Sequence, residues 1–307
     1  MNKKVQFFTI FCMVSTLLQS SADRPLTLPQ AAFTGGIAAV FEVGCSGQPL
    51  TYAMNQRIVN AASRAAIQQP VVKPQSYKSV AVNAGKYWLE SYKGVTAHAG
   101  FQMPIIAMQS VVNAQGVQHV ESVQKHPLSD LQKAGVSFVA GVAGSLIDTP
   151  SNAIQLFLQK KENKDKGNMQ ACKELGFKGL TRGAGVNAGL KEAPFGMALK
   201  FATPKAAQFL QEHGVKNKLI ATAVGGAGVG VVTAVVTQPG AVIRGTMQSD
   251  PHATVYKTAR QTAQKIYEQD GVKGFFRGLP QRGTRVALAV PLLVVCSNAL
   301  EKCIQDR

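Results

Sequence analysis

The chain has 307 residues and a formal net charge of +17, with 16% of its residues charged and 46% hydrophobic. Its basic residues are spread over several segments without interleaved aromatic residues, which argues against nucleic acid as a partner. Five cysteines without paired spacing predict neither a metal site nor a disulfide. No phosphate-cradling loop, metal cluster or nucleophile arrangement is found, so neither a cofactor nor an enzymatic activity is expected.

Residues 1–28 form a leader ahead of the first predicted repeat. Two lysines precede an apolar stretch at 5–18, and small residues follow at 20–22. This order is typical of a secretory signal peptide. The alternative is an interfacial or disordered leader, because the apolar stretch is too short to span a bilayer. The sequence leaves both open.

Two long runs then lack carboxylates, lysines and arginines. From Gly94 to Val120 the only titratable side chains are histidines, and from Leu219 to Ile243 there are none. Each run exceeds the roughly 20 residues that cross a bilayer as a helix. Both are rich in Gly, Ala, Ser, Thr and Gln, which is typical of membrane helices that face one another or water. The pattern favours a polytopic transporter.

Three prolines, Pro49, Pro150 and Pro239, recur about every 90 to 100 residues along the chain. Their neighbourhoods read "GGIAAVFEVGCSGQPLTYAMNQR", "VAGVAGSLIDTPSNAIQLFLQ" and "GGAGVGVVTAVVTQPGAVIRGTMQ". Gly141 and Gly230 lie at the same distance before their prolines. Small residues on one helix face let helix backbones approach closely, and we expect the three prolines to bend their helices.

A second signal follows each proline: "SYKG" ending at Gly94, "LTRG" at Gly183 and "FFRG" at Gly278. Gly176 and Gly271 both stand seven residues before the final glycine of their repeats. Each repeat is therefore predicted to be a helix, a short surface helix and a second helix. Three repeats give six crossings with both termini on the same side of the membrane.

The connecting segments alternate in charge. Segment 57–93 carries six basic residues and one acidic residue. Segment 160–182 carries seven basic and three acidic residues, and segment 244–277 carries six basic and three acidic residues. Segments 121–133 and 205–218 come to zero and plus two. Even crossings under the positive-inside rule produce this alternation.

The chain resembles the mitochondrial carrier family, most specifically in "DGVKGFFRGLPQRGTRV", and the resemblance covers residues 29–304. It implies an all-α membrane protein with six transmembrane helices in three pseudo-symmetric repeats, with short surface helices between odd and even helices. The repeats would be 29–120, 121–212 and 213–307. It also implies a monomeric solute transporter of the inner mitochondrial membrane, with its basic segments in the matrix beside anionic lipids.

In the family, an acid and a base after each motif proline pair between repeats and close the matrix end of the pore. Here the acid positions hold Thr51, Asn152 and Ala241. The base positions hold Met54, Gln155 and Arg244. A three-pair ion network cannot form, although Asn152 could hydrogen-bond Arg244. The family closes the opposite end of the pore with an aromatic-acid pair and a later base near the ends of the even helices. The corresponding stretches here, "VVNAQ", "ATPKAA" and "CSNALEK", do not match that pattern. We expect closure by packing and neutral hydrogen bonds, or a protein that leaks or transports one way.

The family's substrate contacts lie about two turns into the even helices. The matching positions here are His98, Phe101, Gln102, Lys191, Glu192, Arg282 and Arg285. The stretch "GLKEAPFGMALKF" resembles carriers of amino acids and related zwitterions. Structural roles stay open: water-facing for His98, packing for Phe101, mutual neutralisation for Lys191 and Glu192, and reach toward lipid headgroups for Arg285.

The three cations against one carboxylate predict a cavity that attracts a small anionic metabolite. The first expectation is an adenine nucleotide such as ATP or ADP, with Phe101 as a base platform, moved by alternating access and exchange. The alternatives are an amino acid or carboxylate carrier, and a non-transporting or pore-like relative. The signal-like leader further suggests a copy encoded by an intracellular bacterium or virus, or a bacterial membrane or secreted location.

Overall fold

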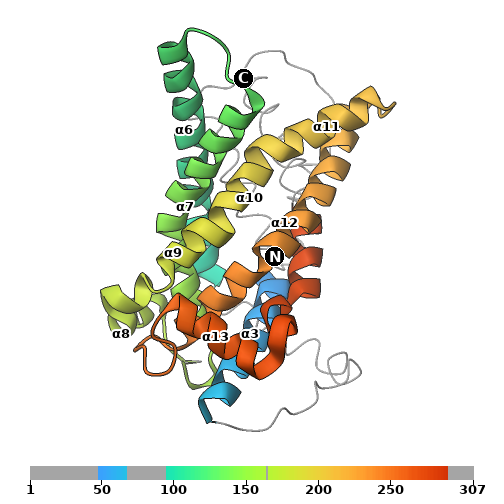
Figure 1. The fold of residues 1–307 in the computed structure, drawn as a ribbon. Coiled ribbons are helices and arrows are strands. Elements are labelled where there is room, and N and C mark those ends of the chain that lie inside the picture. The colour runs from blue at the N-terminus through green and yellow to red at the C-terminus, as the bar shows by residue number, and fades with distance from the viewer. Residues whose placement is uncertain (1–47, 68–94, 164, 290–307) are drawn as a thin grey trace, which may run out of the picture.

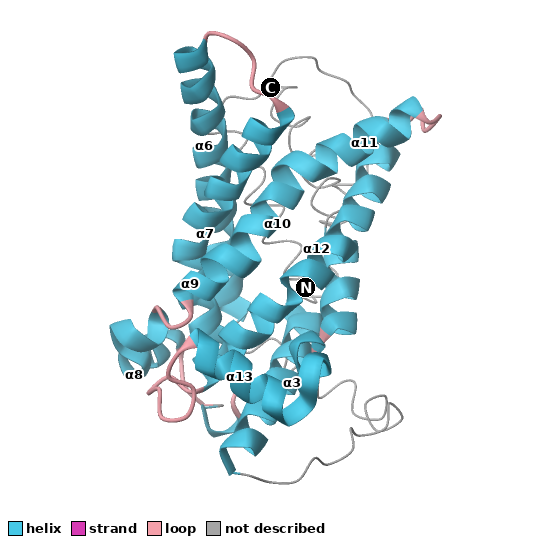
Figure 2. Cartoon of the chain, in the orientation of Figure 1, coloured by secondary structure: helices cyan, strands magenta, loops and turns pink. Residues whose placement is uncertain are grey.

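The computed structural model describes residues 48–67, 95–163 and 165–289, with side chains placed for most of them. Within these ranges every regular element is helical and none is a strand (Figure 2). The all-α expectation is therefore confirmed for this part of the chain. The leader, the segment that ends at Gly94 and the last residues of the third repeat lie outside it.

The helices follow one another as long and short elements. In chain order they are α3 (Gln48–Ile67), α6 (Val95–Gln124), α7 (Asp130–Leu158), η2 (Lys161–Asn163), α8 (Asn168–Leu180), α9 (Ala184–Val186), η3 (Asn187–Glu192), α10 (Ala193–Met197), η4 (Ala198–Ala202), α11 (Thr203–Glu212), α12 (Lys218–Ser249), α13 (Ala259–Asp270) and η5 (Gly271–Phe276). A further helical stretch covers 279–289.

Side-chain caps fix where three helices begin. Ser129 and Gln132 form a reciprocal capping box at the start of α7. The Asn217 carboxamide oxygen accepts from the first backbone N–H groups of α12, and the Thr258 hydroxyl does the same for α13. Each cap satisfies N–H groups that have no partner within the helix.

The long helices lie side by side and their connections gather at two ends (Figure 1). α6 and α7 pack together through the turn at 125–129, and α11 packs on α12 through the turn at 213–217. The short helices α8 and α13 lie together at the opposite end, near α3, which we call the short-helix end. The basic segments 160–182 and 244–277 therefore lie at the opposite end from the turns at 125–129 and 213–217.

One continuous helical path runs from 184 to 212 and contains two π-helical turns, η3 and η4. Pro194 and Pro204 come just after these turns, each near the start of the α-helical piece that follows. A proline ring clashes with the carbonyl four residues earlier in an α-helix. The wider π turn makes room for the ring, so the path continues without a break.

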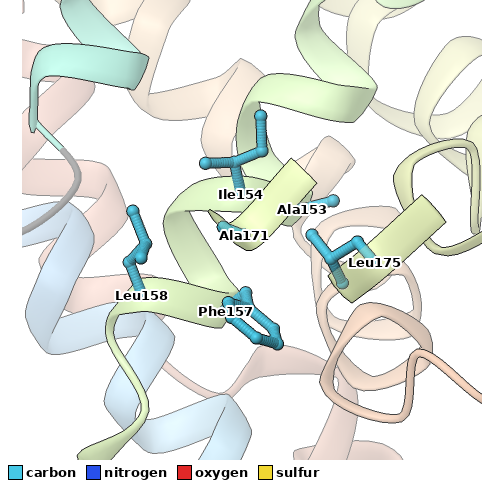
Figure 3. Packing of buried hydrophobic residues seen from close by; sticks show 6 residues of the cluster. All are labelled: Ala153, Ile154, Phe157, Leu158, Ala171 and Leu175. Carbon is cyan, nitrogen blue, oxygen red and sulfur yellow. The ribbon is translucent and has the colours of Figure 1, made fainter. Parts of the chain in front are cut away.

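Apolar side chains join α7 to α8 in one cluster. Ala153, Ile154, Phe157 and Leu158 of α7 pack against α8, as Figure 3 shows at close range. A second cluster joins α3, α12 and α13, and comprises Met54, Ile58, Val242, Ile243, Met247 and Ile266. These clusters attach the short helices to the long ones.

The expected close approach of small residues is present. A Cβ built on Gly141 would lie 2.2 Å from the carbonyl oxygen of Glu192, and one on Gly196 would lie 2.7 Å from the Cα of Gly141. A Cβ built on Gly230 would lie 2.8 Å from Val286. Gly141 and Gly230, which the sequence aligned, thus both pack against the helix that follows them in the same repeat.

The prolines do not end their helices. After Pro49 the helix α3 continues to Ile67, and Pro150 and Pro239 are inside α7 and α12, which continue to Leu158 and Ser249. A proline removes one hydrogen bond of the ladder, and packing on neighbouring helices compensates for that loss. The bend at these prolines stays a prediction.

Candidate functional site

A cavity lies among the long helices, and its wall draws on α3, α6, α7, η3, α10, α12 and residues 279–289. Most predicted residues meet there. From the expected substrate contacts the wall contains Gln102, Lys191, Glu192, Arg282 and Arg285. From the expected gate it contains Thr51, Met54, Asn152, Ala241 and Arg244. Gate and substrate positions, which the sequence treated separately, therefore share one cavity.

Two predicted residues stand elsewhere, and the side chain of a third is not described. Phe101 packs against the apolar cluster between α7 and α8 and does not line the cavity. Gln155 is fully buried outside the cavity wall. The side chain of His98 lies outside the described residues, although its backbone belongs to α6.

Asp148 is the centre of the charged network, and sequence reasoning missed it. Its Oδ2 accepts from Lys191 Nζ at 2.7 Å and from Asn187 Nδ2 at 2.9 Å. Arg244 Nη1 lies 3.9 Å from the same oxygen. Asp148 comes two residues before Pro150, and a carboxylate inside a predicted span is a strong signal of function that the sequence already contained.

Glu192 extends the network toward α6. Its Oε1 lies 2.6 Å from Lys191 Nζ, and its Oε2 accepts from Gln109 Nε2 at 3.3 Å. Lys191 thus bridges two buried carboxylates, one on α7 and one on η3. Lys191 and Glu192 form an ion pair, as expected if they neutralise each other, with Asp148 as a third member.

The charges of the cavity wall do not cancel. It includes the basic Lys191, Arg244, Arg282 and Arg285 against the acidic Asp148 and Glu192, which leaves a formal surplus of two positive charges. In a partly dehydrated space this surplus favours an anionic ligand.

Arg282 is held by the helix it faces. Its guanidinium donates to the Thr237 carbonyl at 3.0 Å, to the Thr237 hydroxyl at 2.5 Å and to Gln238 Oε1 at 3.3 Å. Asn187 stands at the same distance after Gly183 as Arg282 after Gly278, and it bonds Asp148 and Thr149 just before Pro150. Both residues fix an even helix to the proline-containing helix before it.

Neutral amides join α3 and α12 to the C-terminal part of α7 and its cap residue Gln159. Asn55 Nδ2 donates to Gln159 Oε1 at 2.8 Å, and Gln56 Nε2 donates to the Gln159 carbonyl at 2.8 Å. Gln248 Nε2 donates to the Thr149 carbonyl at 3.2 Å. These contacts are neutral hydrogen bonds of the kind that the missing charges predict, and their role in closing the cavity stays a prediction.

The loop after α12 is ordered by a carboxylate. Asp250 accepts from the backbone N–H groups of Thr254, Val255 and Tyr256 at 2.7 to 3.1 Å. Partial burial raises the pKa of Asp250, but these hydrogen bonds outweigh it and hold the pKa at about 2. The Tyr256 hydroxyl in turn donates to the Ala62 carbonyl, which links this loop to α3.

Two glycines with left-handed backbones pack on the base positions of the neighbouring repeat. Gly183 has φ 74° and Gly278 has φ 76°, a region that residues with a Cβ rarely adopt. A Cβ on Gly183 would lie 3.3 Å from Arg244 Cγ, and one on Gly278 would lie 2.8 Å from Met54 Cγ. The segments predicted to be repeats two and three therefore meet, as do those predicted to be repeats three and one, through the same pair of positions.

Comparison with known proteins agrees with this geometry. Residues 215–307, which contain the "FFRG" signal and Pro239, match the mitochondrial carrier protein family. This segment, the predicted third repeat, thus matches the family that the sequence resembles. An uncharacterized mitochondrial carrier of Schizosaccharomyces pombe is 32% identical over 162 residues, which cover 49% of this chain and 55% of the yeast protein. The match thus spans about half the length of the family member from yeast.

Members of the mitochondrial carrier family are transporters rather than enzymes, and the recognition of this family from the sequence is confirmed. Among the described helices, α12 is the one long and apolar enough to cross a membrane.

Proposed function

We propose that this chain is a membrane carrier that moves a small anionic solute by alternating access through the cavity. The architecture behind the proposal is six crossings in the three repeats 29–120, 121–212 and 213–307. Equivalent positions of repeats two and three support it: Gly141 with Gly230, Asn187 with Arg282, and Gly183 with Gly278 make corresponding contacts.

The arrangement of α12 supports a membrane setting. Its exposed side chains include Ile220, Val224, Val232 and Val236, whereas its buried ones are mainly Gly, Ala, Thr and other small or polar residues. A helix of a water-soluble protein has the opposite arrangement. Large aliphatic groups outside and small groups inside are what a helix needs when lipid surrounds the bundle.

The observation that carries the proposed function is the charged network inside the cavity. Ionisable groups are costly at membrane depth and are retained where they line a solute or ion path. Here the buried carboxylates of Asp148 and Glu192 are both bonded to Lys191, and the wall keeps two surplus positive charges. A small anion is the ligand that such a wall accepts best.

Among anions, we favour a carboxylate or amino acid over an adenine nucleotide. The nucleotide expectation relied on Phe101 as a platform for the base, and Phe101 packs against the apolar cluster formed by α7 and α8. The cavity instead presents amides and charged groups together, such as Gln102, Gln109 and Glu192. These groups suit a short solute with both an anionic and a hydrogen-bonding end.

Uptake into liposomes tests the proposal. The purified full chain is reconstituted, and entry of labelled malate, aspartate, phosphate, ADP and ATP is measured with and without internal counter-substrate. We expect saturable uptake of a carboxylate or amino acid that exceeds uptake of ADP and ATP. Uptake restricted to nucleotides would refute the substrate class, and uptake of none of the solutes would refute transport.

A pore-like or non-transporting relative is the second candidate. It is favoured by the sparse charge pairing between repeats: within the described residues, the ion pair that joins repeats two and three in the cavity is the 3.9 Å contact of Arg244 with Asp148. Neutral amide contacts are weaker barriers to opening than a full ion network. Unselective conductance in planar bilayers, without saturable uptake, would favour this candidate.

For location we propose the mitochondrial inner membrane, with the short-helix end and its basic segments facing the matrix. The positive-inside distribution and the family support this orientation. A tagged chain expressed in cultured cells should co-localise with a mitochondrial marker. Retention in the secretory pathway would instead show that residues 1–28 act as a signal peptide.

A further inference from the structure

Arg244 is a buried cation with unused donors. Its side chain is 4% exposed and forms part of the cavity wall. Among the residues that the structure describes, neither its Nε nor its Nη1 has a hydrogen-bond partner. The carboxylate next to it, on Asp148, is too far for a hydrogen bond at 3.9 Å.

The carboxylate of Asp148 is already occupied. Its Oδ2 receives a 2.7 Å bond from Lys191 and a 2.9 Å bond from Asn187. Arg244 therefore shares an anion that two closer donors already neutralise. A buried guanidinium with unused N–H groups is costly unless an acceptor reaches it. The position that the family resemblance assigned to a gate is here equipped to bind an external acceptor.

A second polar atom in the same wall is also unpartnered. Gln109 is fully buried, donates through Nε2 to Glu192, and leaves its Oε1 without a hydrogen-bond donor within the described residues. Gly144 leaves room for the amide, because a Cβ there would lie 2.6 Å from Gln109 Nε2. The cavity thus offers donors at Arg244 and an acceptor at Gln109.

We propose that Arg244 is a ligand for the oxyanion of the bound solute, and that Gln109 Oε1 accepts a hydrogen bond from a hydroxyl or ammonium group of the same solute. The inference rests on the proposed function for its biological meaning, but it concerns binding alone. The solute class is a short hydroxy- or amino-carboxylate, with a phosphate as the other source of an oxyanion.

Binding in detergent micelles tests the inference with the full chain. Succinate, malate, aspartate and inorganic phosphate serve as probes, and calorimetry gives the Kd of each at low salt. The variants are R244Q and R244M, the latter because Met54 shows that a methionine fits over the equivalent glycine. Arg260 is exposed on α13, so R260Q is the control with the same loss of charge.

We expect the wild type and R260Q to bind malate or aspartate, and R244Q and R244M to bind about 30-fold more weakly or worse, as for a truncated buried ion pair. A Q109L variant should bind malate no better than succinate. Wild-type affinity in both Arg244 variants, or no binding of any probe by the wild type, overturns the inference. Tighter binding of phosphate than of every carboxylate overturns the solute class.

The two proposals can fail separately. Loss of anion binding on changing Arg244, combined with no uptake into liposomes, leaves the ligand role intact and refutes transport. Saturable uptake with an unchanged half-saturation concentration in R244M leaves transport intact and refutes the ligand role.

Discussion

Replacing Asp148 with asparagine should destabilise the bundle through a loss of charge balance. The carboxylate is buried and lies 2.7 Å from Lys191 Nζ and 3.9 Å from Arg244 Nη1. Removing one partner of a buried ion pair costs about 3 to 5 kcal/mol. Lys191 keeps Glu192 at 2.6 Å, so we take the lower end, about 3 kcal/mol. For a chain of this size that corresponds to a fall of roughly 6 to 12 °C in apparent Tm.

Thermal unfolding in detergent micelles measures this effect, and a double-mutant cycle assigns it. The D148N and K191M variants are compared singly and together with the wild type. Because the two side chains contact each other, the double variant should be more stable than the sum of the single losses predicts. A D148N variant that melts within 2 °C of the wild type would refute the role of the network, because a loss below about 0.5 kcal/mol is typical of an ordinary surface substitution. Strictly additive losses in the double variant would refute it as well.

Three further outcomes follow from contacts elsewhere. Gly141→Ala places a Cβ 2.2 Å from a backbone oxygen of η3 and should cost about 1 to 3 kcal/mol, whereas Gly185→Ala, with open space around it, should leave the apparent Tm unchanged. Asn55→Ala leaves the buried Gln159 Oε1 without its 2.8 Å donor and should raise passive leak of a small dye from liposomes at unchanged incorporation. Asp250, with a folded pKa of about 2 against 3.8, should stabilise the chain by about 1 kcal/mol above pH 4. That gain disappears as the pH falls toward 2, so the Tm difference between wild type and D250N should vanish there; a constant difference would contradict it.

The periodic signals of the sequence predicted the helical class and several local features of the described residues. The turn after "LTRG" and "FFRG" depends on local backbone chemistry, and both glycines adopt the same left-handed conformation. Gly141 and Gly230 were aligned by spacing, and both occupy close helix contacts. Turn and spacing preferences of this kind depend on a few neighbouring residues, so they can be predicted from the sequence before the fold is known.

The partners inside the cavity were harder to predict, because they depend on side chains from distant segments. Asn152 was the expected partner of Arg244, yet its side chain donates to the Asp148 carbonyl at 2.7 Å, on its own helix. The negative charge near Arg244 comes instead from Asp148. Asp148 lies four residues before Asn152, which is about one helical turn. A motif fixed by its offset from a proline misses an acid that moves by one turn to the same face.

The close contacts at the two glycines with left-handed backbones determine which substitutions of a charged residue the fold tolerates. Gly278 receives Met54 and Gly183 receives Arg244, and both are long, unbranched side chains that contact the glycine through Cγ. The steric requirement at this contact ends at Cγ, before the guanidinium begins. Exchange of a base for methionine therefore keeps the joint between neighbouring repeats while removing its charge. Shape and charge are separable at this position, so a bundle of this kind can change its electrostatics without being rebuilt.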